Sequence, residues 1–278
     1  MSNSPRDRRR IIAEETVRIV DGGWYIAPSG KRVSIDRQVV AAVKGSVILN
    51  DSDVDALPAP LSTRAGEIVV TNESTCDAVY RLSDAGAEHV ACLNFASSRS
   101  PGGGFLKGAQ AQEECLARAS ALYACLVAQE KFYDLNRAAA TRLNLDLFVW
   151  SPLVPFFRLD DSRLRQSPSL ASIITAAAPD LRQGQPPENF SDEKVQNTFI
   201  KRAGLVLRIA AAHGVTHLVL GAWGCGVFLN DPGVVAKAFR HHLTGSGACV
   251  RAFEQVVFAI VDDTVEKKNL GAFQKTFA

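Results

Sequence analysis

Unbroken runs of apolar residues alternate with helical patterns through most of this chain of 278 residues. Such runs are typical of strands in a sheet that is covered on both faces, and the intervening helices connect these strands in parallel. The pattern therefore predicts an α/β fold, a three-layer α/β/α sandwich with a mixed, mostly parallel sheet. The predicted strands are Glu67–Thr71, His89–Asn94, Leu147–Trp150, Val154–Arg158, Ser172–Ala176, Thr216–Leu220 and Gln255–Val261. The predicted helices among them are Ser74–Leu82, Gln112 to about Ala128, Asp192–Ala212 and Asp231–Leu243.

The N-terminal part of the chain follows a different pattern. Apolar spacing over residues 6–20 predicts a helix, and turn residues at 28–31 between two short apolar segments predict a hairpin. An irregular stretch with aspartates and prolines follows at residues 50–61. We therefore expect residues 1–60 to form a helical and hairpin extension packed on a main domain of residues 61–278.

The composition excludes several classes of protein. A hydrophobic content of 47% and a charged content of 22% are ordinary for a globular protein with a sizeable core. The net charge of +2 gives no support for a broad DNA-binding surface, and the basic run Arg6–Arg10 is interpreted as a solvated helix start. No apolar run reaches the ~18 residues of a membrane span, and no secretory signal is present. Six scattered cysteines without a CxxC pair predict reduced thiols and a cytoplasmic location.

Two histidine pairs are weak candidates for a metal site. Gly214 lies between His213 and His217 and is expected to end a helix, which removes a shared face. His241 and His242 are adjacent, so their side chains diverge on a helix. We predict no metal ligands.

The strongest functional signal is a glycine-rich stretch that leads into two acids. Gly102, Gly103 and Gly104 leave three successive positions of the first glycine loop (residues 101–111) without side chains, so a ligand can approach the backbone there closely. Glu113 and Glu114 follow where a helix is expected to begin. A bare loop that precedes two carboxylates is typical of an active site.

The two acids have more than one interpretation. Carboxylates are common in a first helical turn because they complement the helix dipole. Neighbours on a helix also point about 100° apart, so Glu113 and Glu114 are expected to do different work. One carboxylate could hold sugar hydroxyls while the other faces a leaving-group oxygen, as glycosidic cleavage requires. The helix start lowers a carboxyl pKa and burial raises it, and the sequence leaves that balance open.

A second glycine loop (residues 221–231) follows another predicted strand. Asp231 and Pro232 are expected to start the next helix, so the loop amides and the helix dipole favour an anion. The dinucleotide fingerprint is incomplete, because Val, Phe and Leu follow Gly226. Phe228 favours a site where an aromatic ring covers a sugar or base. The alternative is a tight turn without a ligand.

Both motifs together resemble one family. Gly102–Gly104 followed by Gln112-Glu113-Glu114 is similar to the signature of poly(ADP-ribose) glycohydrolases. Gly224–Phe228 resembles the diphosphate-binding loop of that family, and Leu93–Ser97 also fits. The compact length resembles the bacterial type, and the match covers roughly residues 60–265. Ser97 is a departure, because many members have asparagine there.

The resemblance implies a macrodomain-like fold that hydrolyses the ribose–ribose O-glycosidic bond of poly(ADP-ribose), mainly from the chain end, and releases ADP-ribose. It implies that Glu114 is the catalytic acid and that Glu113 binds ribose hydroxyls. Residues 262–277 are a candidate cap over the adenosine ribose. The substrate-binding residues that we expect are Gly102, Gly103, Gly104, Phe105, Gln112, Gly224, Cys225, Gly226, Val227 and Phe228.

The partners expected from the resemblance are poly(ADP-ribose), ADP-ribose and poly(ADP-ribosyl)ated proteins, in a monomer of the DNA damage response that uses neither cofactor nor metal. Two alternatives stay open. One is a macrodomain that binds ADP-ribose without cutting, although such modules do not require paired acids. The other is a hydrolase of mono-ADP-ribosyl links, which uses a similar pocket.

Overall fold

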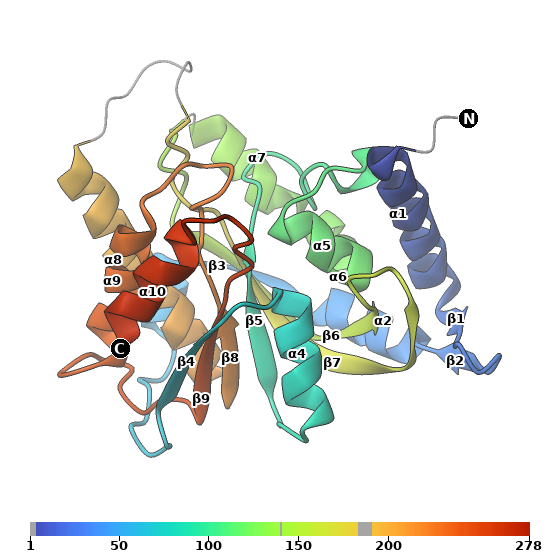
Figure 1. Ribbon diagram of the computed structural model, residues 1–278, viewed down its shortest axis with the longest axis horizontal. Coiled ribbons are helices and arrows are strands. Elements are labelled where there is room, and N and C mark those ends of the chain that lie inside the picture. Colours follow the sequence, from blue (N-terminus) through green and yellow to red (C-terminus); the bar gives the residue numbers. More distant parts are fainter. Residues whose placement is uncertain (1–3, 140, 183–190) are drawn as a thin grey trace.

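The computed structural model describes residues 4–139, 141–182 and 191–278, and Figure 1 shows a central sheet between two layers of helices. The sheet has seven strands in the order β3-β6-β7-β5-β8-β9-β4 within these ranges. The strands β7, β5, β8, β9 and β4 run parallel to one another, whereas β6 pairs antiparallel with both β3 and β7. The predicted mixed, mostly parallel sheet is confirmed. The strands are β3 Val47–Asn50, β4 Glu67–Thr71, β5 Val90–Phe95, β6 Leu147–Arg158, β7 Leu164–Ala176, β8 His217–Leu220 and β9 Gln255–Ala259.

Two hydrophobic clusters cover the two faces of the sheet. Adjacent residues of β5 show the division, because Cys92 and Leu93 are both fully buried but belong to different clusters. A strand that is buried on both faces has no polar alternation, which explains the apolar runs in the sequence. One face carries α2 Asp36–Gly45, α4 Thr75–Asp84, α5 Gln112–Ala119 and α6 Leu122–Val127. The other carries α3 Asp51–Asp55, α8 Asp192–Ala212, α9 Pro232–Leu243 and α10 Lys268–Phe277.

The N-terminal helix and hairpin form as predicted. They are α1 Pro5–Gly22 and the antiparallel pair β1 Trp24–Ile26 and β2 Arg32–Ser34. Residues 47–50, which the sequence pattern did not mark as a strand, form β3 at one edge of the central sheet. The first 60 residues thus contribute to the sheet itself, and the domain boundary near residue 60 stays a prediction.

The single long helix predicted from Gln112 to about Ala128 is wrong, because two helices occupy this stretch. Ser120 has an extended backbone (φ −144°, ψ 179°) and pairs with Phe156 of β6. Its hydroxyl donates to the Leu116 carbonyl and accepts from the Leu122 amide, so it stabilises both ends of the break. The apolar pattern continues across the break because both helices pack in the same cluster.

The two short strands predicted at 147–150 and 154–158 are parts of one strand, β6, with a register shift between Ser151 and Val154. Its partner β7 begins at Leu164, well before the predicted Ser172. The remaining elements of the described ranges are the helix α7 Glu130–Ala139 and the short 3₁₀ turn η1 Phe105–Lys107.

Candidate active site

The two glycine loops both begin at the carboxyl ends of parallel strands of the central sheet. The first follows β5 and the second follows β8, and these strands are parallel neighbours in register Cys92↔Val219. Parallel neighbours bring their carboxyl ends together, and ligands of open α/β sheets bind at that edge. Phe95 joins the loops directly, because a Cβ built on Gly221 would lie 3.0 Å from the Phe95 ring.

Glu113 and Glu114 lie in the first turn of α5 and are only 3% and 7% exposed. Glu113 is held at both oxygens: Oε2 accepts from the Ser97 amide at 2.8 Å, and Oε1 accepts from the Asn94 side chain at 3.3 Å. Glu114 Oε1 accepts from the Gly104 amide at 2.8 Å. The second oxygen of Glu114, Oε2, is buried and has no hydrogen-bond partner within the described residues. Among the four carboxylate oxygens of these two acids, Glu114 Oε2 is thus the one without a hydrogen-bond partner in the described part of the chain.

Burial decides the protonation of Glu113. Loss of solvent raises its pKa to about 8, and the charge of Glu114 acts in the same direction. The hydrogen bonds from Ser97 and Asn94 favour the carboxylate and oppose this rise without cancelling it. For Glu113, the effect of burial, which raises the pKa, therefore exceeds the effect of the helix N-terminus, which lowers it.

The position of Gly103 explains why the first loop has a residue without a side chain there. Its φ is +59°, and a Cβ there would lie 2.5 Å from Glu114 Oε1 and 2.9 Å from Glu113 Oε2. Real Cβ contacts are not this short, so any side chain at Gly103 would push both carboxylates away. The loop backbone at Gly103 therefore lies close against both acids.

The side chain of Gln112 links the first turn of α5 to the end of β5 through hydrogen bonds. Its side-chain oxygen accepts from the Phe95 amide at 2.9 Å, and its nitrogen donates to the Leu93 carbonyl at 2.8 Å and to Thr75 Oγ1 at 3.1 Å. These bonds fix the orientation of the helical turn that carries both acids. Gln112 also lines the neighbouring cavity.

Phe105 has a different place from the one that the resemblance implied. Its ring is fully buried, packs with Ala13 and Ala117, and lies 5.0 Å from the ring of Tyr123. No surface of the ring is left for a ligand in this conformation, because the loop folds its side chain inward. A direct contact of Phe105 with substrate is therefore corrected to an anchoring role.

The second glycine loop offers free amides. In the described part of the chain, the amides of Gly226, Val227 and Phe228 have no acceptor. Asp231, by contrast, caps the first turn of α9 by accepting from the amides of Gly233 and Val234, which confirms the predicted cap. Because this carboxylate occupies the helix start, the loop amides and not the helix end form the candidate anion site.

A neighbouring segment holds the second loop in shape. Gly224 has φ +75°, and a Cβ there would lie 2.6 Å from the Ala178 Cβ. The Asn230 amide group donates to the Pro179 carbonyl at 2.7 Å and to the Gly224 carbonyl at 3.0 Å, and the Leu181 amide donates to the Phe228 carbonyl. Segment 178–182 therefore holds the conformation of the second loop through these contacts.

A cavity of about 590 Å³ lies between the two loops. Gly224, Gly226, Val227 and Phe228 line one side, and Phe95, Gln112 and Cys115 line another. Asn269 of α10 also borders it, which places the helix at the predicted cap beside the cavity. The predicted site residues that do not line this cavity are Gly102, Gly103, Gly104, Phe105, Glu113, Glu114 and Cys225. Burial raises the pKa of the Cys225 thiol to about 12.

Asn94 and Arg182 also contact the site residues, although neither is predicted as a site residue from the sequence. Asn94 is a fully buried polar residue in an apolar strand, which was the available signal. Arg182 lies with its guanidinium 5.3 Å from the centre of the Phe228 ring. No local sequence signal predicts this contact, because Arg182 and Phe228 are distant along the chain.

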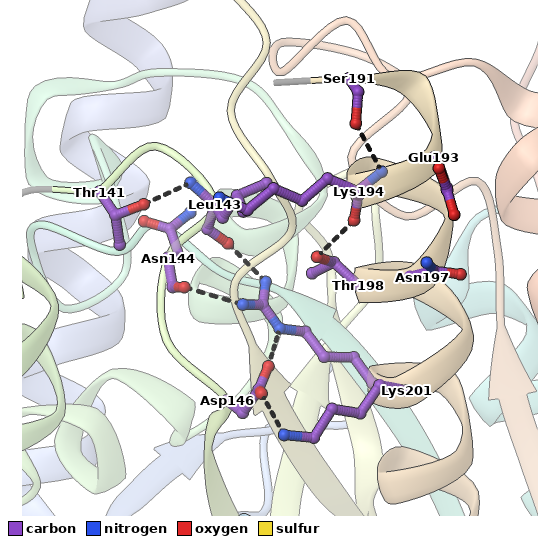
Figure 2. A pocket seen from close by; sticks show the side chains of 11 residues that line it. Thr141, Leu143, Asn144, Asp146, Ser191, Glu193, Lys194, Asn197, Thr198 and Lys201 are labelled. Carbon is purple, nitrogen blue, oxygen red and sulfur yellow. Dashed lines mark hydrogen bonds and ion pairs between the residues drawn. The ribbon is translucent and has the colours of Figure 1, made fainter. Parts of the chain in front are cut away.

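A second cavity, of about 560 Å³, lies between residues 141–146 and α8 (Figure 2). Three of its charged side chains, Asp146, Lys201 and Arg202, are already paired. Arg202 donates to Asp146 at 2.6 Å and to the carbonyls of Leu143 and Asn144, while Lys201 bridges Asp146 and Asp51. These contacts tie α8 to the loop before β6 and indicate a structural network. Over the described ranges, no group of three or more His, Cys, Asp or Glu could hold a metal ion.

Comparison with known proteins identifies the family. Residues 13–159 match the model of the microbial-type PARG catalytic domain, PARG being poly(ADP-ribose) glycohydrolase. The structure of PARG from Thermomonospora curvata is 41% identical with a TM-score of 0.93, over 98% of this chain and 100% of that one. The chain belongs to the microbial-type PARG family. It is accordingly a hydrolase of glycosidic bonds with the macrodomain-like fold of this family.

Two related structures contain ligands. PARG from Deinococcus radiodurans in complex with ADP-ribose is 40% identical with a TM-score of 0.77, over 86% of this chain and 96% of that one. Thermomonospora PARG bound to the inhibitor ADP-HPD is 42% identical with a TM-score of 0.91, over 98% of this chain and 100% of that one. A comparison with curated proteins gave no match. No helix in the described ranges is long and apolar enough to cross a membrane.

Proposed function

We propose that this protein hydrolyses the ribose–ribose O-glycosidic bond of poly(ADP-ribose), mainly from the chain end, with Glu114 as the catalytic acid. Family membership supports the reaction, and the unpartnered Oε2 of Glu114 carries the assignment of the acid. Both oxygens of Glu113 already accept hydrogen bonds from the protein, so Glu113 is the less available proton donor.

The reaction runs in two proton transfers. Protonated Glu114 gives its proton to the leaving ribose oxygen while the glycosidic C–O bond breaks through an oxocarbenium-like transition state. The Glu114 carboxylate then takes a proton from a water molecule, whose oxygen bonds to the same sugar carbon. The products are ADP-ribose and a polymer with a free hydroxyl, and Glu114 is regenerated. Glu113 holds the hydroxyls of the reacting ribose.

The second loop binds the rest of the ADP-ribose unit. The free amides of Gly226, Val227 and Phe228 suit the oxygens of a diphosphate, and Phe228 packs on the adjoining ribose. The cavity between the loops accommodates the adenosine, and α10 beside it supports the preference for the chain end. The polymer on poly(ADP-ribosyl)ated proteins is the expected source of substrate, in the DNA damage response. Six free cysteines fit a reducing compartment such as the cytoplasm.

The decisive experiment is Glu114→Gln in a polymer-digestion assay with product sizes resolved, alongside calorimetry with ADP-ribose. We expect kcat to fall by ~10³-fold or more, because general acid and base catalysis by one group contributes about 10²–10⁴-fold at each step. ADP-ribose affinity should stay within about threefold, since the second loop is untouched. Glu130→Gln, an exposed carboxyl on α7, is the control. Undiminished turnover in Glu114→Gln would overturn the assignment.

A further inference from the structure

We infer that helix α1 positions the first glycine loop for catalysis and that Arg6, Arg9 and Gly108 are positioning residues of the reaction. This inference rests on the proposed function, because it concerns the loop whose Gly104 amide holds Glu114. It gives a task to the N-terminal helix, which sequence reasoning treated as an extension packed on the core.

The arginines of α1 reach the loop backbone directly. Arg6 Nε donates to the Lys107 carbonyl at 3.0 Å, and Arg9 Nε donates to the Gly108 carbonyl at 2.8 Å. Figure 1 shows the turn before α5 lying against α1. The basic run at residues 6–10 is thus more than a solvated helix start, because two of its members bind a loop about 100 residues later in the chain.

Gly108 lets the two backbones meet. Its φ is +71°, and a Cβ there would collide with the Arg6 carbonyl oxygen and lie 3.2 Å from the Arg10 amide nitrogen. Backbone atoms of a helix cannot move aside singly, so a side chain at Gly108 would displace α1 or the loop. Phe105 completes the contact by packing against Ala13.

A short path connects this contact to the acid. The Gly104 carbonyl accepts from the amides of Lys107 and Ala109 at 2.9 and 3.1 Å, and the Gly104 amide donates to Glu114 Oε1 at 2.8 Å. The position of residues 107–109 therefore sets where the Gly104 amide points. A shift of about 1 Å in catalytic geometry can cost ~10²-fold in rate.

α1 also holds the helix that carries Glu114. Thr16 Oγ1 donates to the Arg118 carbonyl of α5 at 2.9 Å, and Arg118 in turn donates to the Ala109 carbonyl at 2.8 Å. Loop and acid are therefore fixed to the same N-terminal helix. The second glycine loop has no such contact among the helix–loop hydrogen bonds of the described residues, so ADP-ribose binding should be independent of α1.

The test is a charge-matched pair of double variants in the full chain. Arg6→Gln with Arg9→Gln removes both donors, whereas Arg8→Gln with Arg18→Gln removes the same charge from exposed positions of α1 that make no contact with the loop. We expect the first pair to lower kcat on polymer about tenfold and to leave the ADP-ribose dissociation constant within about twofold. The control pair should keep kcat. Equal kcat in both double variants would refute the inference.

A second comparison uses glycines that share a left-handed backbone. Gly108→Ala meets α1, whereas Gly86→Ala, with φ +86°, meets nothing within 4 Å. Both carry the backbone cost of a side chain at positive φ, but only Gly108→Ala should lower kcat at unchanged ADP-ribose affinity. If Gly108→Ala does not fold, the double variant of Arg6 and Arg9 still tests the inference. Activity retained by Glu114→Gln would defeat the proposed function, while normal kcat in the Arg6 and Arg9 variant beside an inactive Glu114→Gln would defeat only this inference.

Discussion

The two glycine loops differ in what their missing side chains make room for. In the first loop, Gly103 is wedged between the carboxylates of Glu113 and Glu114, so the space is filled by the protein's own acids. In the second, a Cβ on Gly226 would meet nothing within 4 Å, and Val227 is 57% exposed. The missing side chain at Gly103 makes room for the acids, whereas the missing side chain at Gly226 leaves open space, which the proposed function assigns to the ligand.

Their supports differ in the same way. The first loop is fixed by groups that also belong to the proposed catalytic centre, so any displacement of the loop should change the rate. The second loop is supported by hydrogen bonds with segment 178–182. We therefore expect variants of the first loop to act on kcat and variants of the second to act on affinity.

The sharpest test pairs Gly103→Ala with Gly226→Ala. Gly103→Ala should lower kcat at least ~100-fold, since the new Cβ displaces both carboxylates from their places. Gly226→Ala should leave kcat and the thermal midpoint close to wild type and change only the affinity for ADP-ribose. Steady-state kinetics on polymer and calorimetry measure both. Normal kcat in Gly103→Ala would break the distinction between the loops.

The burial of the Glu113 carboxyl predicts that the stability of the protein depends on pH. The pKa of Glu113 is raised to about 8 by burial, so its protonated form contributes stability that is fully present below the unfolded pKa of 4.5 and lost as pH rises through 8. Glu113→Gln stays neutral throughout. Its free energy of unfolding relative to wild type should therefore increase by about 2 kcal/mol between pH 6 and pH 8.

Urea unfolding at several pH values measures this difference, with the exposed Glu130→Gln as the background. A constant difference between Glu113→Gln and wild type across this range would mean that Glu113 is as solvated as an ordinary carboxyl, contrary to its burial.

The support of the second loop predicts an effect on binding. Gly224→Ala places a methyl group against Ala178 and beside Asn230, and it also forces a side chain at φ +75°. We expect ADP-ribose to bind about tenfold more weakly, or ~1.4 kcal/mol, with kcat within about threefold of wild type. Calorimetry and kinetics separate the two quantities. A loss confined to kcat would contradict independent roles for the loops.

The smallest effect is expected at the rim of the second loop. Arg182 lies over the Phe228 ring at 5.3 Å, and an exposed cation–π contact contributes ~0.5–1 kcal/mol. Arg182→Gln should weaken ADP-ribose binding about two- to fivefold without changing kcat. Arg64→Gln, which removes a partner of Glu254 elsewhere, is the control. Equal affinities in the two variants would show that Phe228 needs no support from Arg182.

Local sequence was sufficient where a feature depends on neighbouring residues. The apolar strands, the helix cap at Asp231 and the two glycine motifs are all local, and the structure contains each of them. The break at Ser120 was missed because its cause is pairing with Phe156, a residue distant in sequence. The strand at 47–50 was missed because its apolar pattern is short and only the edge of the sheet gives it a partner.

The sequence by itself determined the fold class, the pairing of two glycine loops with two acids, and the family. Tertiary structure alone decided which acid keeps a free oxygen, because Ser97, Asn94 and Gly104 supply the donors that occupy the others. It also decided the raised pKa of Glu113 and the contact between α1 and the first loop. The physical reason is common to all three: burial and hydrogen bonding depend on segments that are distant along the chain and become neighbours only in the folded protein.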